Sequence, residues 1–287
     1  MKAFKTVVIP ALCIHLLSCK KADQWQESAL NTSYKQTLYS ISYGDAKRNQ
    51  MDIALPKNRT TNTPVVILIH GGAWVLGDKS YFAREIQQFA DAGVACATIN
   101  YSFASNPKNI HHNEIVADIR RAVDFIASKS TDWQVSPNKF GLAGHSAGGH
   151  LALITSYTKN QDAKIKACVS WAGPLDFIDA EQLQIDRAKE VFKIYVGRTL
   201  NTSNDTALYK AASPYWTADN NSVPTLLIHG TLDTGVPYTN AVKMQQHLES
   251  LGVYDSLLLM EGAYHIWTGQ HLRHAQNATL DWFSTKL

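Results

Sequence analysis

The sequence predicts an α/β fold in which a mostly parallel central sheet carries helices on both faces. From about residue 64 onwards, apolar runs of strand length alternate with longer stretches of helical period. These runs are continuous rather than alternating, which is typical of strands that helices cover on both faces. An alternating hairpin precedes them and a mixed polar segment interrupts them. We therefore expect one domain over residues 37–287, with an antiparallel N-terminal hairpin and a small cap insertion.

Composition and charge limit the class of protein. The chain has 287 residues, of which 45% are hydrophobic and 18% are charged, and its net charge is only +3. These values are ordinary for a globular protein with a sizeable core. No block of Lys and Arg interrupts the sequence, so we expect no nucleic-acid partner. The oligomeric state is not indicated by any pattern.

The N-terminus has the pattern of an export signal. Basic residues at positions 1–5 precede an apolar run, Thr6–Leu17, which is too short to span a bilayer. The run ends in Leu16–Cys19, which resembles the lipobox of bacterial lipoproteins. This resemblance implies a signal peptide over residues 1–18, lipidation of Cys19, and a membrane-anchored protein in or beyond the periplasm. Residues 19–36 would form a tether, and the alternative is an ordinary cleaved signal with an incidental cysteine.

The first half of the domain is predicted as a hairpin followed by alternating strands and helices. Polar and apolar residues alternate over Thr37–Tyr43, and the turn at Gly44-Asp45 leads to a second strand. Helix Asn113–Lys129 is clearly amphipathic, with an apolar stripe at spacings of three and four. In chain order, the remaining elements expected here are strand Gln50–Leu55, strand Pro64–Ile69, helix Ser80–Ala92, strand Val94–Asn100, strand Lys139–Ala143, helix Ser146–Tyr157 and strand Ala167–Trp171.

The second half begins with a break in this rhythm. Residues 174–222 are polar and mixed, with one amphipathic stretch at Glu181–Tyr195, and we expect them to form the cap. The alternation then resumes, which returns the chain to the sheet. The elements expected after the cap are strand Thr225–His229, helix Tyr238–Leu251, strand Ser256–Met260 and helix Gln270–Thr285.

A candidate nucleophile lies between a predicted strand and a predicted helix. Gly144-His145-Ser146-Ala147-Gly148 has the form G-x-S-x-G, and the strand ends directly before it. A strand–turn–helix setting presents the serine on a tight turn, where the flanking residues must be small. The helix that follows also directs its positive end at the serine. The pattern therefore predicts Ser146 as the nucleophile, against the alternative of a passive serine in a glycine-rich turn.

A second motif follows an earlier strand. His70-Gly71-Gly72-Ala73-Trp74 comes directly after Pro64–Ile69. With the serine motif, it resembles the α/β-hydrolase esterases of the hormone-sensitive-lipase and feruloyl/acetylxylan-esterase types, and also the kynurenine formamidases. The resemblance covers residues 37–287 in motif order. It implies an oxyanion hole made by the amides of Gly72, Ala73 and Ala147, with a structural His70. Ala73-Trp74 replaces the third glycine of many lipases, which favours the feruloyl/acetylxylan-esterase and formamidase branches.

Candidates for the acid and the base follow in the order that this fold uses, Ser, Asp and His. Asp233 lies in a loop directly after strand Thr225–His229. Of the eleven histidines, His265 lies in a small-residue loop between a strand and the last helix, whereas His271 and His274 fall within that helix. We expect His265 to be the base and Asp233 the acid. His145 and His150 flank the serine, and the resemblance implies local packing roles for them.

The sequence also gives predictions about the substrate pocket, the need for a cofactor and the state of two cysteines. Trp74, Trp171 and Trp267 are candidates to line a substrate pocket, although core packing is an equal alternative. The chemistry needs no metal or cofactor, and no H-x-x-x-H or C-x-x-C spacing occurs. The sheet order that the hydrolase resemblance implies places the strands of Cys96 and Cys168 on opposite sides of the two strands that precede His70 and Ser146. Three strand spacings then separate the cysteines by about 14 Å, which is beyond disulfide reach. Both are predicted to be buried free thiols.

The function predicted is hydrolysis of carboxylic esters through an acyl-enzyme, with a small-molecule ester as substrate. Small acyl or aryl esters, including acetyl and feruloyl esters of polysaccharides, are the candidates. One alternative is an arylformamidase, which uses the same three residues on an amide of formate. Another alternative is a non-catalytic binding protein on a hydrolase fold, although such proteins typically lose one of the three residues.

Overall fold

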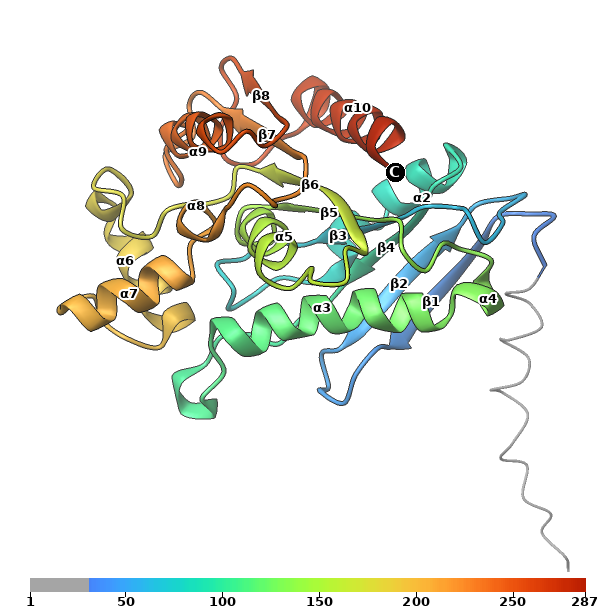
Figure 1. Ribbon diagram of the computed structural model, residues 1–287, viewed down its shortest axis with the longest axis horizontal. Coiled ribbons are helices and arrows are strands. Elements are labelled where there is room, and N and C mark those ends of the chain that lie inside the picture. The colour runs from blue at the N-terminus through green and yellow to red at the C-terminus, as the bar shows by residue number, and fades with distance from the viewer. Residues whose placement is uncertain (1–30) are drawn as a thin grey trace, which may run out of the picture.

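A computed structural model describes residues 31–287, which form one domain around an eight-stranded sheet (Figure 1). The predicted signal peptide, Cys19 and most of the predicted tether lie outside the described residues. The strands are β1 (Gln36–Ser42), β2 (Gln50–Leu55), β3 (Val65–Ile69), β4 (Ala95–Ile99), β5 (Phe140–His145), β6 (Ile165–Trp171), β7 (Thr225–Gly230) and β8 (Asp255–Met260).

The sheet is parallel except at its N-terminal edge. Its strand order is β1-β2-β4-β3-β5-β6-β7-β8, and every pair from β4 to β8 is parallel. The pairs β1–β2 and β2–β4 are antiparallel, which confirms the predicted hairpin at the edge. The carboxyl ends of β5, β7 and β8 therefore lie along the same edge of the sheet. In open α/β sheets, ligands bind at the edge formed by the carboxyl ends of the strands.

Helices cover both faces of the sheet (Figure 1). Buried residues of α2 and α10 pack on one face, whereas those of α3, α5 and α9 pack on the other. The helices are η1 (Lys79–Phe82), α2 (Glu85–Asp91), η2 (Asn106–Lys108), α3 (His112–Ser128), α4 (Ser130–Trp133), α5 (Ala147–Thr158), η3 (Gln182–Gln184), α6 (Asp186–Val196), α7 (Ser203–Ala211), α8 (Pro214–Thr217), α9 (Thr239–Ser250) and α10 (Gly269–Lys286).

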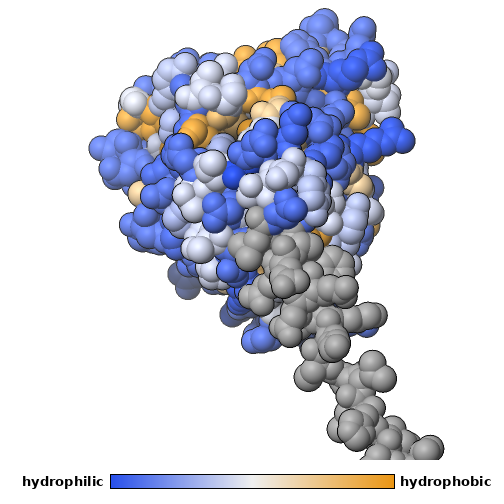
Figure 2. Space-filling model, turned by 90° about the vertical axis from the view of Figure 1, so that its right-hand side faces the viewer, coloured by the Kyte–Doolittle hydropathy of each residue, from blue (hydrophilic) through white to orange (hydrophobic). Residues whose placement is uncertain are grey.

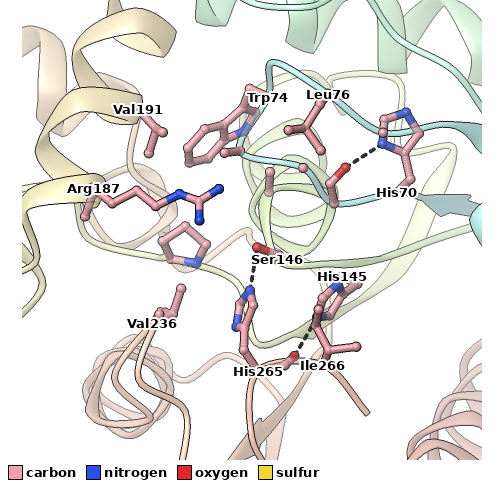
Figure 3. Close-up of a pocket in the computed structure, with 18 of the residues that line it drawn as sticks. His70, Trp74, Leu76, His145, Ser146, Arg187, Val191, Val236, His265 and Ile266 are labelled. Atoms are coloured by element: carbon pink, nitrogen blue, oxygen red, sulfur yellow. Dashed lines mark hydrogen bonds between the residues drawn. The ribbon is translucent and has the colours of Figure 1, made fainter. Parts of the chain in front are cut away.

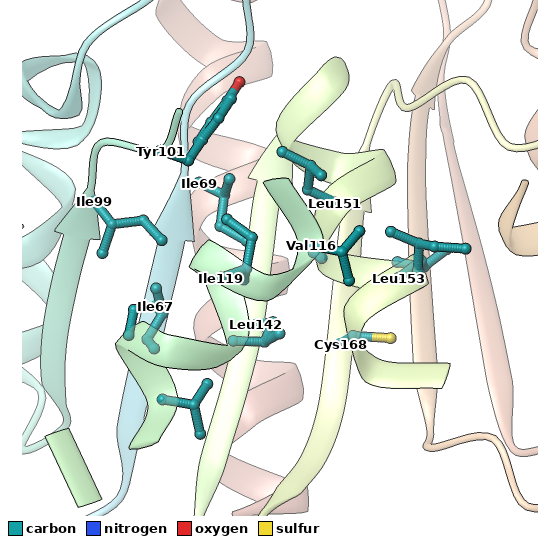
Figure 4. Close-up of a cluster of buried hydrophobic side chains, with 14 of the residues drawn as sticks. Ile67, Ile69, Ile99, Tyr101, Val116, Ile119, Leu142, Leu151, Leu153 and Cys168 are labelled. Atoms are coloured by element: carbon teal, nitrogen blue, oxygen red, sulfur yellow. The ribbon is translucent and has the colours of Figure 1, made fainter. Parts of the chain in front are cut away.

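Branched side chains of the sheet form the core together with α3 and α5 (Figure 4). β3 has the buried run that the sequence predicts, since all five of its residues are buried. Ile119 of α3 and Leu151 of α5 are fully buried against this face of the sheet. The apolar stripe of α3 thus lies on the core side, and burial of such side chains contributes roughly 25 cal/mol per Å² removed from water.

One predicted helix is divided in two. The sequence pattern predicts a single helix over Ser80–Ala92, but the structure has the 3-10 helix η1 followed by α2. Lys79 is held from outside, because its Nζ pairs with Asp52 at 2.6 Å and its carbonyl accepts from Thr98 Oγ1 at 2.8 Å. These contacts with β2 and β4 fix the first turn in a direction that α2 does not continue, and the apolar pattern carries no trace of them.

Cys96 and Cys168 are buried free thiols, as predicted. They lie on β4 and β6, which are separated by β3 and β5 in the sheet. The Cys168 thiol contacts Thr225 Oγ1 at 3.3 Å, and burial raises its pKa to about 12. Burial also raises the pKa of the Cys96 thiol, so neither thiol readily ionises at neutral pH.

The predicted cap is an insertion between β6 and β7 and contains η3, α6, α7 and α8 (Figure 1). Phe192 and Tyr195 of α6 are buried in the same core cluster as α5. Trp74, in the loop after β3, stacks on Tyr195 with ring centroids 4.5 Å apart. The cap is thus packed firmly on the domain rather than attached by its two ends alone.

Figure 2 shows the face that carries α2 and α4, which hydrophilic residues largely cover, with small groups of hydrophobic residues near its upper edge. Among the described residues, no helix has the length and hydropathy needed to cross a membrane.

Candidate active site

Ser146 lies on a strained turn between β5 and α5. Its backbone has φ 55° and ψ −121°, a conformation that costs free energy for any residue with a Cβ. The Ser146 N–H donates to the carbonyl of Trp171 at 2.7 Å, which ties the turn to β6. This turn conformation directs the Ser146 hydroxyl away from the sheet, at the carboxyl end of β5, where it is accessible.

The turn requires glycine because several backbone segments meet there. A Cβ added to Gly148 would lie 1.9 Å from the carbonyl oxygen of Ile69, the last residue of β3. A Cβ on Gly71 would lie 3.2 Å from Cβ of Ser146. The two glycine-containing motifs therefore meet directly, although they are far apart in the sequence.

The three predicted residues form one hydrogen-bonded chain. His265 Nε2 lies 2.9 Å from Ser146 Oγ, and His265 Nδ1 lies 2.6 Å from Asp233 Oδ2 (Figure 3 shows the first of these bonds). An ionised carboxylate only accepts, so Nδ1 carries the proton and Nε2 accepts from the serine hydroxyl. This tautomer leaves Nε2 ready to take a proton from Ser146.

Asp233 is held in its ionised form by its neighbours. Burial by itself raises the pKa of this carboxyl group, but hydrogen bonds from His229 and His265 outweigh that effect and hold the pKa well below its usual range. The other carboxylate oxygen accepts from the N–H groups of Gly235 and Val236, at 2.8 and 2.9 Å. Four donors thus fix the orientation of the carboxylate.

His229, at the end of β7, organises this loop and was not singled out from the sequence. Its Nε2 lies 2.9 Å from the carbonyl of Val236 and 3.2 Å from Asp233 Oδ2, so one N–H bridges both acceptors. The signal was present in the spacing, because the histidine precedes the acid by four residues at a strand end. The contacts of His229 with Asp233 and Val236 form only when the loop after β7 folds back over the end of the strand.

His145 does more than the packing role that was expected of it. Its Nε2 lies 2.8 Å from the carbonyl of His265 and donates to it, which links the strand before the nucleophile to the loop that carries the base. Burial, with a smaller contribution from the charge of His265, lowers the pKa of His145 to about 4, so this imidazole is neutral at pH 7. His150 packs as expected, with its Nε2 2.8 Å from the carbonyl of Ala212.

The loop after β3 presents backbone amides to the serine. His70 stacks on Tyr101 and its Nδ1 donates to the carbonyl of Gly71 at 2.7 Å, in line with the structural role implied for it. The backbone of Gly72 and Ala73 has positive φ, at 117° and 50°. Within the described part of the chain, the N–H groups of Gly72, Ala73 and Ala147 have no hydrogen-bond acceptor. All three residues line the cavity above Ser146.

The cavity above Ser146 has a volume of about 420 Å³ and a mostly apolar lining (Figure 3). The loop after β3 contributes Leu76, the loop that carries the acid contributes Val236, and the loop that carries the base contributes Ile266. The cap closes the remaining side. Its contributions to the lining are Pro174, Gln182, Ile185, Arg187, Ala188, Val191 and Phe192.

Two of the three predicted pocket tryptophans lie elsewhere. Trp74 lines the cavity, but Trp171 and Trp267 do not. Both are buried in the second core cluster, on the face with α2 and α10, where Trp171 Nε1 donates to Thr279 Oγ1 at 2.8 Å. Alternation along β6 explains this placement, because the side chain of Trp171 is directed to the face opposite the cap. The cap residues that do line the cavity were not predicted, since nothing in their pattern shows how α6 is oriented.

Among the described residues, no group of three or more His, Cys, Asp or Glu side chains could hold a metal ion.

The fold and this arrangement define the α/β-hydrolase class: a serine on a strand–helix turn, followed in sequence by an acid and a histidine at the same edge of the sheet. The chain belongs to the BD-FAE family, whose model matches residues 51–248.

Curated relatives share this chain's sequence at moderate identity. A probable isoprenylcysteine α-carbonyl methylesterase of Arabidopsis thaliana is 27% identical over 252 residues, which cover 79% of this chain and 50% of the relative. The probable carboxylic ester hydrolase LipM of Mycobacterium tuberculosis is 29% identical, over 70% of this chain and 49% of the relative. The chain thus spans about half the length of these relatives.

Solved structures share the fold. A truncated carbohydrate esterase from gut microbiota superimposes with a TM-score of 0.75 at 21% identity, over 89% of this chain and 97% of the other. Esterase 2 of the planctomycete Thermogutta terrifontis, in a butyrate-bound form, gives a TM-score of 0.69 at 19% identity, over 85% and 92% of the two chains.

Proposed function

We propose that this protein hydrolyses carboxylic esters, with Ser146 as the nucleophile, His265 as the base and Asp233 as the acid. The observation that supports this most directly is the hydrogen-bonded chain from Ser146 Oγ through His265 to Asp233, which begins at the floor of an apolar cavity. Membership of the BD-FAE family and the esterase names of the relatives agree with it.

The first half of the reaction forms an acyl-enzyme. Ser146 Oγ attacks the carbonyl carbon of the ester while His265 Nε2 takes the hydroxyl proton. The carbonyl oxygen becomes negative, and the free N–H groups of Gly72, Ala73 and Ala147 stabilise it. His265 then donates its proton to the alcohol, which leaves as the carbon–oxygen bond breaks.

The second half repeats these steps with water. His265 takes a proton from a water molecule, whose oxygen attacks the acyl carbon, and the proton returns to Ser146 Oγ when the acid leaves. Asp233 stays ionised throughout, because the donors around it hold its pKa low. Its role is to orient the imidazole and to stabilise the imidazolium ion.

The cavity supports small ester substrates. A volume of about 420 Å³ lies in the range of small-molecule sites, and apolar side chains form most of the lining. Acyl groups of a few carbons, or an aryl acyl group such as a feruloyl group, fit this size and polarity. We extend the proposal to acetyl and feruloyl esters carried on polysaccharides, which the carbohydrate esterase among the structural neighbours also suggests.

Turnover of 4-nitrophenyl acetate and of N-formylkynurenine by purified protein tests the reaction class. We expect the ester to be hydrolysed with the larger kcat/KM, whereas faster turnover of the formamide would indicate an arylformamidase instead. A fluorophosphonate probe tests catalytic competence without any choice of substrate. Labelling at Ser146 is the expected result, and a folded protein without an adduct would favour a non-catalytic binding role.

We further propose that the protein is exported and anchored to a membrane through lipidated Cys19. The support is the basic start, the apolar run and the Leu-Leu-Ser-Cys sequence. Expression of the full chain in a bacterial host with labelled palmitate tests this. Label in the membrane fraction that disappears in Cys19→Ala is the expected result, and unlabelled secreted protein would contradict it.

A further inference from the structure

The wall of the cavity that the cap provides carries an unneutralised positive charge. Among the described residues that line the cavity, Arg187, in the first turn of α6, is the only Lys or Arg. Figure 3 shows its guanidinium group extended from α6 into the same space that Ser146 faces. In the described part of the chain this group has no hydrogen-bond or ion-pair partner. Its neighbour Asp186 pairs instead with Lys189, at 3.1 Å.

No carboxylate of the lining compensates this charge. Asp78 is the only Asp or Glu in the described part of the lining, and it is already engaged, because it accepts from the N–H of Ser80 and from Asn100 Nδ2, both at 2.9 Å. Burial works against ionisation of Asp78, but these hydrogen bonds prevail and lower its pKa to about 2. Asp233 lies behind His265 and does not line the cavity. Arg187 is exposed, and its guanidinium group thus extends into a mostly apolar cavity without a partner among the described residues.

The position of Arg187 is set by packing. One residue further along α6, Ala188 is buried, and Phe192 and Tyr195 anchor the same helix in the core. Tyr195 in turn stacks on Trp74, which belongs to the loop with the oxyanion amides. The backbone from which Arg187 extends is thus fixed relative to the reacting carbonyl, although its side chain keeps rotational freedom.

We propose that Arg187 binds a carboxylate group of the substrate, so that the preferred esters are anionic. This inference rests on the ester hydrolysis proposed above and adds the charge of the substrate. The guanidinium group offers two parallel N–H donors that match a carboxylate, and an apolar surrounding strengthens such a pair. The carboxylate belongs either to the acyl part of the ester or to the alcohol part, and the two cases are separated by experiment.

Two matched pairs of substrates test the proposal. Mono-4-nitrophenyl adipate places the carboxylate on the acyl side, and its terminal amide is the neutral counterpart. The compound 4-acetoxybenzoate places the carboxylate on the alcohol side, and 4-acetoxybenzamide is its neutral counterpart. We expect one of the two pairs to show a kcat/KM about fivefold higher for the anion, mainly through KM, since an ion pair with an exposed side chain contributes this order of effect.

The variant Arg187→Gln should bring that ratio of kcat/KM close to one, and Arg187→Lys should restore part of it. Lys193→Gln removes the same charge from α6 outside the cavity lining and should leave the ratio unchanged. An equal preference in wild type and Arg187→Gln, or no preference for either anion, would overturn the inference while hydrolysis of the neutral esters still supports the proposed function. Failure to hydrolyse all four compounds and 4-nitrophenyl acetate would instead contradict the proposed function itself.

Discussion

At the scale of single residues, Ser146 carries the sharpest prediction. The variant Ser146→Ala removes the attacking oxygen, and we expect kcat on 4-nitrophenyl acetate to fall by roughly 10⁶-fold. Alanine meets the same backbone strain at φ 55°, so the unfolding midpoint should stay close to that of the wild type. Initial rates and a urea titration measure both. A well-folded variant that keeps a tenth of the activity would contradict the assignment.

Asp233 fixes the tautomer of His265 in addition to supplying a negative charge. The variant Asp233→Asn places an amide where the carboxylate accepts from His265 Nδ1, so the imidazole can adopt the tautomer that no longer accepts from Ser146. We expect kcat to fall by up to ~10⁴-fold. The surface substitution Asp132→Asn is the matched control and should have no effect. Loss of stability without loss of kcat would assign Asp233 a structural role instead.

The residues that approach the reacting atoms were predictable from sequence, whereas those that orient them were not. Ser146, Asp233 and His265 stand in loops directly after apolar strands, and the order of parallel strands brings such loops to one edge. The contacts of His229 and His145 depend on how two loops fold back on the strands, which local patterns do not encode. The inward direction of Arg187 depends in the same way on the tertiary placement of α6.

At the scale of elements, the contact between α5 and β3 makes a prediction about stability. The variant Gly148→Ala places a methyl group 1.9 Å from the Ile69 carbonyl, so α5 must move away from the strand. We expect a loss of about 3 kcal/mol in the free energy of unfolding, together with lower kcat. Gly252→Ala has open space around its Cβ but a φ of 72°, and should cost only ~1 kcal/mol. Similar losses in the two variants would contradict this account.

Hydrophobic periodicity predicted which helices and strands exist, but it did not predict where a helix is interrupted. The amphipathic stripe of α3 and the buried run of β3 agree closely with the prediction. The break between η1 and α2 arises from the ties of Lys79 to neighbouring strands. In the cap, α7 begins at a local capping box of Thr202 and Asp205, but the placement of α6 depends on the stacking of Tyr195 on Trp74. Contacts of this kind are distant in sequence and leave no local period.

At the scale of the whole molecule, buried imidazoles predict how stability depends on pH. Burial lowers the pKa of His70 and of His145 to about 4 and that of His150 to about 3, against roughly 6.5 in an unfolded chain. Between pH 6.5 and 4 the unfolded chain therefore binds more protons than the folded one, so the free energy of unfolding falls as pH falls. The lowered pKa of Asp233 acts in the same direction at lower pH.

Urea unfolding at pH 7.5, 5.5 and 4.5 measures this effect. We expect the free energy of unfolding to decrease by several kcal/mol in all, on the order given by three groups whose pKa values change on folding. The variant His150→Gln keeps a donor near the carbonyl of Ala212 but cannot be protonated, and it should flatten the dependence. A midpoint that stays constant or rises towards pH 5 would contradict the explanation.

The base belongs to the loop after β8, the outermost strand, and its partner Ser146 lies 119 residues earlier in the chain. The first seven strands by themselves thus hold the nucleophile but lack the imidazole. Because a domain folds as a unit, the base reaches the nucleophile only once the whole sheet, β8 included, has formed. Release of 4-nitrophenol from 4-nitrophenyl acetate during refolding would therefore report completion of the sheet up to its last strand.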